Sequence, residues 1–462
     1  KMKIKLIQPS VGKIKDEKYV RTWQMEPLGI ATIAGLTPDD HDIDFVDDRF
    51  DEINYDDGAD LVGITVETYT AQRAYKIAEG FRERGIPVVM GGIHASLATD
   101  EVKDNCDAIV VGGAEFTWAK VLEDAEKGKL ESFYREPRPG KGDELLAVSP
   151  RREIFDGKPY LPLKMIETGR GCPFVCDFCA IAGSYEQSYV SKSIDDIVQA
   201  VDEVDGRFVY FSDDNFVSRF GRTKDLCDAL APLGKSWFSH GSINMADDTE
   251  LLRKLEKSGC MNILIGFESL NPETLKDMGK SWNIQKRGYS EALGKLRDHG
   301  ITVYGTFVFG YDNDTIDDFE RTLEFAIEQK LALAAFNHLV PFPKTPLYER
   351  FKKDGRLKED KWWLREGYRF GQVAFEPKNM TAEELTEGCY DLRKKFYSVT
   401  STAKRMWEFS ANSKTFTQAV VGTYSNLASN FGVQQRQAWP IGSVVTREEL
   451  DHGELWNPWE KN

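Results

Sequence analysis

The chain has 462 residues, which is too long for one small domain and predicts two or three. Hydrophobic residues make up 41% and charged residues 29%, a balance typical of folded globular proteins. The net charge of −15 repels phosphate backbones, so nucleic acid is not an expected partner. No apolar run approaches the roughly 18–20 residues of a membrane span, and the N-terminal segment shows no signal peptide.

Residues 1–134 alternate strand-like runs with helical stretches such as 71–84. Strands are predicted at residues 3–8, 42–46, 61–65, 87–90 and 108–111. This alternation favours an α/β domain with a doubly wound, Rossmann-like parallel sheet, which binds ligands at the carboxyl ends of its strands. Those ends carry polar and glycine-bearing segments, with Pro9, Thr65, Val66, Glu67, Gly91, Gly92, His94, Gly112, Gly113 and Glu115 as candidate ligand-binding residues.

A polar, proline-bearing stretch follows, and it predicts a linker over residues 135–158. A second alternating series occupies residues 159–350, with strands expected at 164–167, 208–211, 237–242, 262–267, 302–309 and 332–339. Helices are expected at 194–204, 223–231, 249–258, 290–299 and 316–329. Six successive βα units suggest a partial (β/α)6 barrel of the TIM type. Residues 351–462 are predicted to be mainly helical, including 383–398.

The cysteines are unevenly placed. Seven are too few for a disulfide framework, and three of them, Cys172, Cys176 and Cys179, follow a C-x3-C-x2-C spacing after the first barrel strand. Three thiolates suit an iron–sulfur cluster or zinc, with buried free thiols as a third interpretation. We favour the cluster, because structural zinc needs a fourth ligand and none lies nearby in sequence. The other four cysteines are expected to be reduced packing residues.

The motif and its βα context resemble the radical S-adenosylmethionine (SAM) superfamily over roughly residues 160–345. The resemblance implies a [4Fe–4S] cluster on the three cysteines, with SAM bound to the open iron and cleaved reductively to a 5′-deoxyadenosyl radical. An oxygen-sensitive cluster implies a reducing cytoplasm. An electron donor such as flavodoxin or ferredoxin is also expected.

The resemblance assigns further residues to SAM. Phe178 would lie beside the adenine, although core packing is an alternative. Ser212, Asp213 and Asp214 follow the second barrel strand, where the family holds the methionine amino group, and an acidic pair suits an ammonium ion. The alternative for this segment is a helix cap or turn.

Two later strands complete the expected SAM site. Glu268 and Ser269 end the fourth barrel strand, where relatives contact the ribose. The fifth strand, which includes Gly305 and Phe309, lies near the adenine in relatives, although a buried strand with glycines for close packing is equally favoured. The turn at residues 341–348 resembles a proline-glycine-threonine-proline turn of the same branch, with Lys344 in place of the glycine.

An N-terminal parallel sheet fused to such a barrel resembles the cobalamin-binding branch, which includes hopanoid and bacteriochlorophyll methylases and the anaerobic porphyrin cyclase. The glycine pairs at 91–92 and 112–113 match its loops. Many cobalamin proteins carry an aspartate-x-histidine-x-x-glycine motif whose histidine ligates cobalt, and no such motif follows the first strand here. We therefore interpret His94 as a loop or cofactor-edge residue and expect cobalamin without histidine ligation. A vestigial domain is the alternative.

The resemblance implies a cobalamin-dependent radical SAM methyltransferase, in which a substrate radical takes the methyl group from methylcobalamin at an unactivated carbon of a small molecule. A cobalamin-dependent oxidation, cyclisation or rearrangement is the first alternative, and a non-catalytic cobalamin or metal sensor is the second. Aromatic side chains after the barrel suit packing or a lid, and secondarily an apolar cleft. Four basic residues are surface residues by default but could bind a carboxylate or phosphate: Lys344, Arg365, Arg369 and Arg436.

Overall fold

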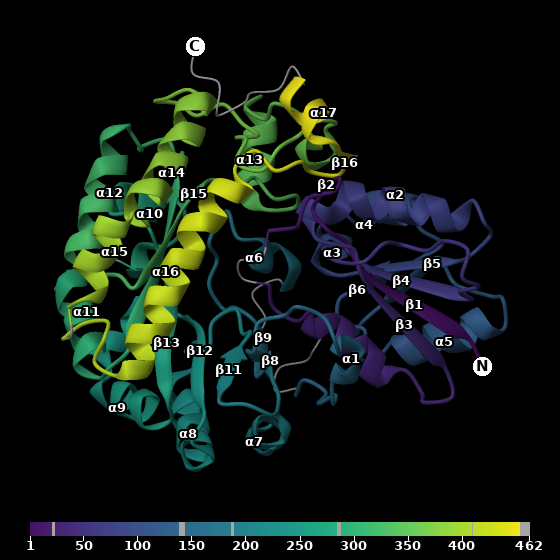
Figure 1. The fold of residues 1–462 in the computed structure, drawn as a ribbon, viewed down its shortest axis with the longest axis horizontal. Coiled ribbons are helices and arrows are strands. Elements are labelled where there is room, and N and C mark those ends of the chain that lie inside the picture. Colours follow the sequence, from purple (N-terminus) through teal and green to yellow (C-terminus); the bar gives the residue numbers. More distant parts are fainter. Residues whose placement is uncertain (21–23, 138–143, 186–188, 284–287, 409, 453–462) are drawn as a thin grey trace.

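The computed structural model describes residues 1–20, 24–137, 144–185, 189–283, 288–408 and 410–452. Two α/β units lie side by side, the N-terminal sheet in purple and blue and the barrel in teal and green (Figure 1). The long C-terminal helix α16 (Phe416–Arg436) runs along the barrel. The domain order therefore follows the predicted α/β architecture.

The N-terminal sheet has six parallel strands in the order β3-β1-β4-β5-β6-β7. The five predicted strands are present, and a sixth, β7, occupies the position where the linker was predicted to begin. The order reverses between β1 and β4, which opens a crevice at the carboxyl ends of the strands. The elements are β1 (Lys3–Gln8), α1 (Leu28–Leu36), β3 (Asp42–Asp47), β4 (Leu61–Thr65), α2 (Ala71–Arg82), β5 (Val88–Gly91), α3 (Ile93–Leu97), α4 (Thr99–Asp104), β6 (Ala108–Val111), α5 (Trp118–Glu126) and β7 (Phe133–Arg135).

The linker prediction is tested only in part, since residues 138–143 lie outside the described residues. The described remainder carries the short helix η2 (Arg152–Phe155), and Phe155 packs into the N-terminal domain against Phe45. The same segment also contacts the barrel domain, because the Leu145 N–H donates to the carbonyl of Ser191 and Arg152 donates to the carbonyl of Met165.

The second sheet is an open, six-stranded parallel barrel with the order β15-β14-β13-β12-β11-β8. Side chains alternate along each strand: Val209 and Phe211 of β11 are buried against helices, whereas Tyr210 faces the lumen. The elements are β8 (Lys164–Ile166), β9 (Gly169–Gly171), α6 (Ala180–Tyr185), β10 (Tyr189–Ser191), α7 (Ile194–Glu203), β11 (Phe208–Phe211), α8 (Phe220–Leu230), β12 (Ser236–Gly241), α9 (Thr249–Lys257), β13 (Cys260–Glu268), α10 (Pro272–Asp277), α11 (Tyr289–Asp298), β14 (Thr302–Phe309), α12 (Asp317–Glu328) and β15 (Leu333–His338).

Local sequence chemistry explains several helix starts. Ser193 and Asp248 cap α7 and α9 by accepting the N–H groups of Asp196 and Leu251. A capping box at Thr381 begins α14, close to the predicted start. These caps satisfy amide groups that the helices themselves leave without partners.

The C-terminal region divides between the two domains. Helices α14 (Ala382–Phe396), α15 (Val399–Met406) and α16 pack on the barrel, whereas Trp362, Trp363 and Tyr368 join the core of the N-terminal domain. Helix α13 (Pro346–Lys353) follows the 341–348 turn. Strand β16 (Val444–Val445) pairs with β2 (Lys13–Ile14), and α17 (Arg447–His452) ends the described chain. Within the described residues, no helix is both long and apolar enough to cross a membrane.

Candidate functional site

The three motif cysteines lie on the loop between β9 and α6. Their side chains are half-buried, whereas the other four cysteines are buried, and all seven thiols are free. The pKa of Cys176 is raised to about 12, mainly by burial, with smaller contributions from the neighbouring Cys179, Glu268 and Cys172. In the described part of the chain, no group of three or more His, Cys, Asp or Glu residues is arranged to hold a metal ion. A four-iron cluster binds each cysteine through a different iron, so three separated thiols on one loop fit that group.

Asp177, inside the motif, anchors the cysteine loop to the barrel. Its carboxylate accepts the Tyr311 hydroxyl at 2.5 Å and pairs with Arg350 at 2.8 Å. Its backbone N–H donates to Met278, and its carbonyl accepts from the N–H of Leu347. The loop is thus fixed at one residue by partners from three other segments, since Leu347 and Arg350 both belong to α13.

The acidic pair after β11 holds the other end of this loop. Asp213 is 1% exposed, and its two oxygens accept the backbone N–H and the hydroxyl of Thr168 at 2.7 and 2.5 Å. Asp214 accepts the N–H of Gly171, directly before Cys172, at 2.8 Å. Burial raises the pKa of Asp213 to about 7 and also raises that of Asp214. Thr168 engages both oxygens of Asp213, and the contact of this acidic pair with the methionine amino group stays a prediction.

Glu268 is part of a buried ion pair that the sequence did not reveal. It lies at a register shift between β13 and β14 with φ of 61°, and its carboxylate accepts Lys280 Nζ at 2.7 Å. Lys280 Nζ also donates to the carbonyl of Gly266 at 2.9 Å. The ammonium group lowers the pKa of Cys176 against the larger effect of burial. Lys280 lies in no recognisable motif. It could have been expected only from the general rule that a buried carboxylate needs a cation as its partner.

The remaining SAM predictions have mixed outcomes. Phe178 is half-buried beside the barrel core, so its contact with SAM stays a prediction. The Ser269 hydroxyl accepts the N–H of Asn271 in the following turn. The Phe309 side chain is 3% exposed and packs 4.8 Å from Phe319 of α12, and the expected contact between its strand and the adenine stays a prediction. A Cβ on Gly305 would lie 2.6 Å from Leu331, which supports close packing as the reason for this glycine.

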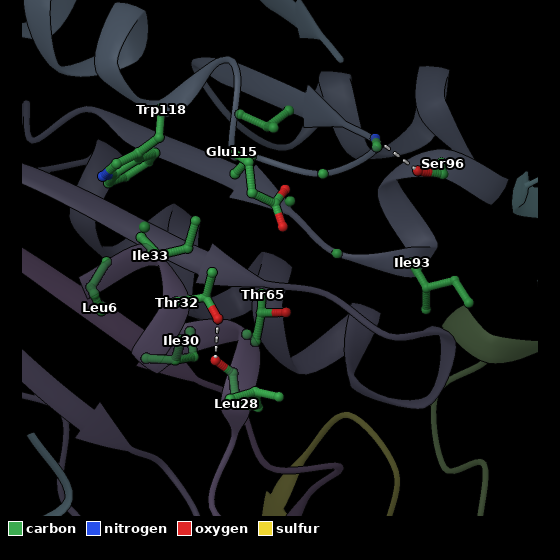
Figure 2. Close-up of a pocket in the computed structure, with 18 of the residues that line it drawn as sticks. Leu6, Leu28, Ile30, Thr32, Ile33, Thr65, Ile93, Ser96, Glu115 and Trp118 are labelled. Carbon is green, nitrogen blue, oxygen red and sulfur yellow. Dashed lines mark hydrogen bonds between the residues drawn. The ribbon is translucent and has the colours of Figure 1, made fainter. Parts of the chain in front are cut away.

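A cavity of about 350 Å³ lies over the carboxyl ends of β4, β5 and β6 (Figure 2). Six of the predicted cobalamin residues line it: Thr65, Gly91, Gly92, Gly112, Gly113 and Glu115. The prediction missed apolar residues of α1 such as Leu28 and Ile33, which form another wall. It also missed residues around the cysteine loop that close the cavity from the barrel: Glu167, Arg170, Ser184 and Ser212. The cavity therefore spans both domains.

The glycines of this cavity leave room for a ligand. Gly92 and Gly112 have φ values of 100° and 86°, which favour glycine. A Cβ on Gly29 of α1 would meet no atom within 4 Å, so it would enter open space at the cavity wall. A mostly apolar cradle that reaches the strand backbone, with polar groups at its rim, fits part of a cobalamin molecule.

Four predicted cobalamin residues do not line the cavity. His94 is fully buried on α3, its ring nitrogens lie 3.1 Å from the Thr68 hydroxyl and 3.2 Å from Glu101, and Trp363 packs against the ring. The assignment of His94 to a cofactor edge is therefore wrong, since it is a satisfied core histidine. The other three are the buried Pro9 and Val66 and the exposed Glu67.

Arg170 joins the cavity to the cysteine loop. Its guanidinium donates to Glu115 of the first domain at 2.7 Å and to both oxygens of Glu167 at 2.8 and 3.0 Å. The three side chains are 16%, 5% and 19% exposed. Burial raises the pKa of Glu115, but Arg170 outweighs it and holds that pKa below its ordinary value. This network ties the segment before Cys172 to the floor of the cavity.

The fold and this paired site define an enzyme class. Residues 166–326 match the radical SAM superfamily model, and residues 20–122 match the B12 binding domain model. The chain belongs to the cobalamin-binding radical SAM enzymes, whose cofactors are a [4Fe–4S] cluster, SAM and cobalamin.

Among its relatives, bacteriochlorophyllide d C-12(1)-methyltransferase of Chlorobaculum tepidum is 31% identical, over 82% of this chain and 84% of the relative. Hopanoid C-2 methylase of Rhodopseudomonas palustris is 29% identical, over 73% of this chain and 66% of the relative. The fold is similar to that of the radical SAM methyltransferase TsrM from Kitasatospora setae with cobalamin and [4Fe–4S] cluster bound, with a TM-score of 0.61, 15% identity, and coverage of 92% and 91% of the two chains. OxsB with aqua-cobalamin gives a TM-score of 0.62 at 15% identity, with coverage of 93% and 72%.

Proposed function

We propose that this enzyme transfers a methyl group to an unactivated carbon of a hydrophobic small molecule. The observation that carries the proposal is the cavity shared by the two domains, which places Thr65 and Glu115 of one domain in the same space as Ser212 of the other. The bound cofactors would supply the radical that activates the substrate and the methyl group that it receives. Relatives that are named as bacteriochlorophyllide methyltransferases and a hopanoid methylase support both the reaction and the hydrophobic substrate.

The chain's own residues would position and shield this chemistry. Cys172, Cys176 and Cys179 are the proposed cluster ligands, on a loop that Asp177 and Asp214 fix from both ends. Apolar residues of α1 and of the strands would exclude water from the shared cavity, which reactive intermediates require. The electron donor is proposed to be a flavodoxin or ferredoxin.

Product analysis under anaerobic conditions tests the reaction. The reconstituted enzyme would be incubated with a reductant, SAM and bacteriochlorophyllide d, the first substrate to try. Methyl transfer predicts a product heavier by one methylene unit, together with S-adenosylhomocysteine and 5′-deoxyadenosine. Substrate-dependent 5′-deoxyadenosine without S-adenosylhomocysteine would refute methyl transfer and favour the cyclase-like alternative, a reaction class named among the relatives.

Cofactor content tests the assignments separately. Cys176→Ala should lose the cluster's charge-transfer absorbance, whereas Cys106→Ala, in the core of the first domain, should keep it. A full cluster in the Cys176 variant would refute the ligand assignment. Protein produced with cobalamin should contain one cobalt per chain; full activity without cobalt would show that the first domain is vestigial.

A further inference from the structure

A second cavity, of about 280 Å³, lies in the barrel lumen. We call it the lumen cavity. Its walls include Phe208, Thr302 and Leu333, which begin β11, β14 and β15, so it occupies the amino ends of the strands, opposite the cysteine loop. Residues of α16, among them Val421 and Tyr424, close its open side. No predicted site residue lies in this cavity, so neither cofactor site accounts for it.

The chemistry of the walls suits hydrocarbon rather than water. Most of the wall surface is apolar, and several of the polar wall side chains bond within the protein. The Asn262 amide donates to the Thr302 hydroxyl at 2.8 Å, and that hydroxyl donates to the carbonyl of Met261 at 2.9 Å. The Gln418 amide donates to the carbonyl of Gly300 at 2.6 Å. Water would find few partners here, and protein interiors seldom leave an apolar space of this size unfilled.

Helix α16 gives the lumen cavity an apolar border at the surface. Five exposed apolar side chains follow one another every three or four residues and form a ridge: Phe416, Val420, Tyr424, Leu427 and Phe431. The polar residues Asn426 and Ser429 are buried on the other side, and residues 416–435 include no charged residue. Tyr424 is 65% exposed and also lines the cavity, so the ridge and the cavity meet at this residue. A ligand that enters here would meet apolar surface at each step.

A polar pair separates the lumen cavity from the cysteine loop. The Tyr210 hydroxyl, in the cavity wall, lies 2.5 Å from His240 Nε2. His240 is the next residue of β12 after Phe238 that faces the lumen, on the side of the cysteine loop, and it bonds to the backbone of Asp213. The Tyr210–His240 pair therefore lies between the apolar cavity and the acidic segment that braces the cysteines.

We propose that the lumen cavity binds the hydrocarbon part of the substrate and that this part enters beside α16. The inference rests on the proposed function and specifies its substrate class. The substrate is an amphiphile with an uncharged hydrocarbon group, which the lumen binds while the reacting carbon lies toward the cysteine loop. The hydrocarbon part would be bound by the apolar cavity walls, several of whose polar groups already have hydrogen-bond partners within the protein.

Two neighbouring valines provide a matched test. Val421 lines the lumen cavity, whereas Val420 points to solvent on the ridge. Val421→Trp should fill the cavity, and Val420→Trp should not. The first probe is N-phenyl-1-naphthylamine, an uncharged fluorophore, titrated into full-length enzyme loaded with its cofactors. Wild type and the Val420 variant should bind it with blue-shifted emission, and the Val421 variant should bind at least tenfold more weakly.

Controls separate this inference from misfolding and from the proposed function. Iron and cobalt content and thermal unfolding should match among the three proteins. Equal probe binding by the two variants, or none by wild type, would overturn the inference. Once product analysis has identified the methyl acceptor, Val421→Trp should raise the KM for that acceptor at least tenfold relative to Val420→Trp. An unchanged KM would overturn the assignment of the lumen cavity to the substrate. If the wild type never cleaves SAM, the proposed function fails. Probe binding then tests only whether the lumen cavity binds an apolar ligand.

Discussion

Replacing Arg170 with methionine tests whether the two domains are joined through a buried charge network. The substitution keeps much of the side-chain volume but leaves Glu115 without its cation and Glu167 with only Lys192, at 3.6 Å. Removing one partner of a buried ion pair costs about 3–5 kcal/mol, so the unfolding free energy at pH 8 should fall by that amount. The matched control is Arg82→Met, which breaks a surface pair at 3.3 Å and should cost less than about 1 kcal/mol.

The pH dependence gives the sharper test. In the wild type, Arg170 holds the pKa of Glu115 below its ordinary value, so this stabilisation is present above the unfolded-state pKa and is lost only as pH falls through the lower folded value. Without Arg170, burial raises the pKa of Glu115, so the variant gains stability as pH falls from 8 toward 5. The difference in unfolding free energy between the variant and the wild type, measured in urea, should therefore be smaller at pH 5.5 than at pH 8. A constant difference, or one below about 1 kcal/mol at pH 8, would refute the network's role.

Three further substitutions have defined outcomes. Asp177→Asn breaks the anchor of the cysteine loop, so iron affinity, measured by chelator competition, should fall about tenfold or more; unchanged affinity would contradict this role. Gly29→Val should weaken cobalamin binding about tenfold in equilibrium dialysis, because its methyl groups enter the shared cavity, whereas Gly221→Val on the exposed face of α8 should not. Lys344 has φ of 64°, a backbone conformation that is strained for residues other than glycine. Lys344→Gly should therefore raise the unfolding free energy, measured in urea, by about 1 kcal/mol. A loss of stability would show that the contacts of the Lys344 side chain outweigh this strain.

The sequence predicted most of the fold because the periodicity of parallel strands is strong. Runs such as residues 108–111 are buried along their whole length, which is typical of strands covered on both faces. Strand β7 was missed because it has three residues and borders the proline-bearing stretch. Helix α1 was missed because it is apolar on all sides and has no side-chain cap, so it lacks both an amphipathic pattern and a start signal.

The candidate site could be predicted where the position of a residue at the end of a strand is enough to bring it to the cavity. Gly91 ends β5 and Gly112 directly follows β6, and the topology brings them to one cavity. Side-chain direction was less accessible: Phe309 ends the correct strand but faces α12, because residues along a strand alternate between its two faces. His94 follows the correct loop, yet Glu101 seven residues later binds its ring from α4, a contact that only the tertiary fold creates.

The acidic segment after β11 holds the cysteine loop, a role that its sequence motif does not suggest. Asp213 and Asp214 both accept hydrogen bonds from the chain that leads into the cysteines, so their charges are used to fix that loop. A buried cation that acts on the cysteines is Lys280, which lowers the pKa of Cys176 and which Glu268 neutralises. A ligand that brought its own carboxylate to this place would compete with Glu268 for Lys280, whereas its ammonium group would compete with Lys280 for Glu268. One buried ion pair can therefore exchange partners with a zwitterion without leaving either charge uncompensated, which is what binding an amino acid group at low dielectric requires.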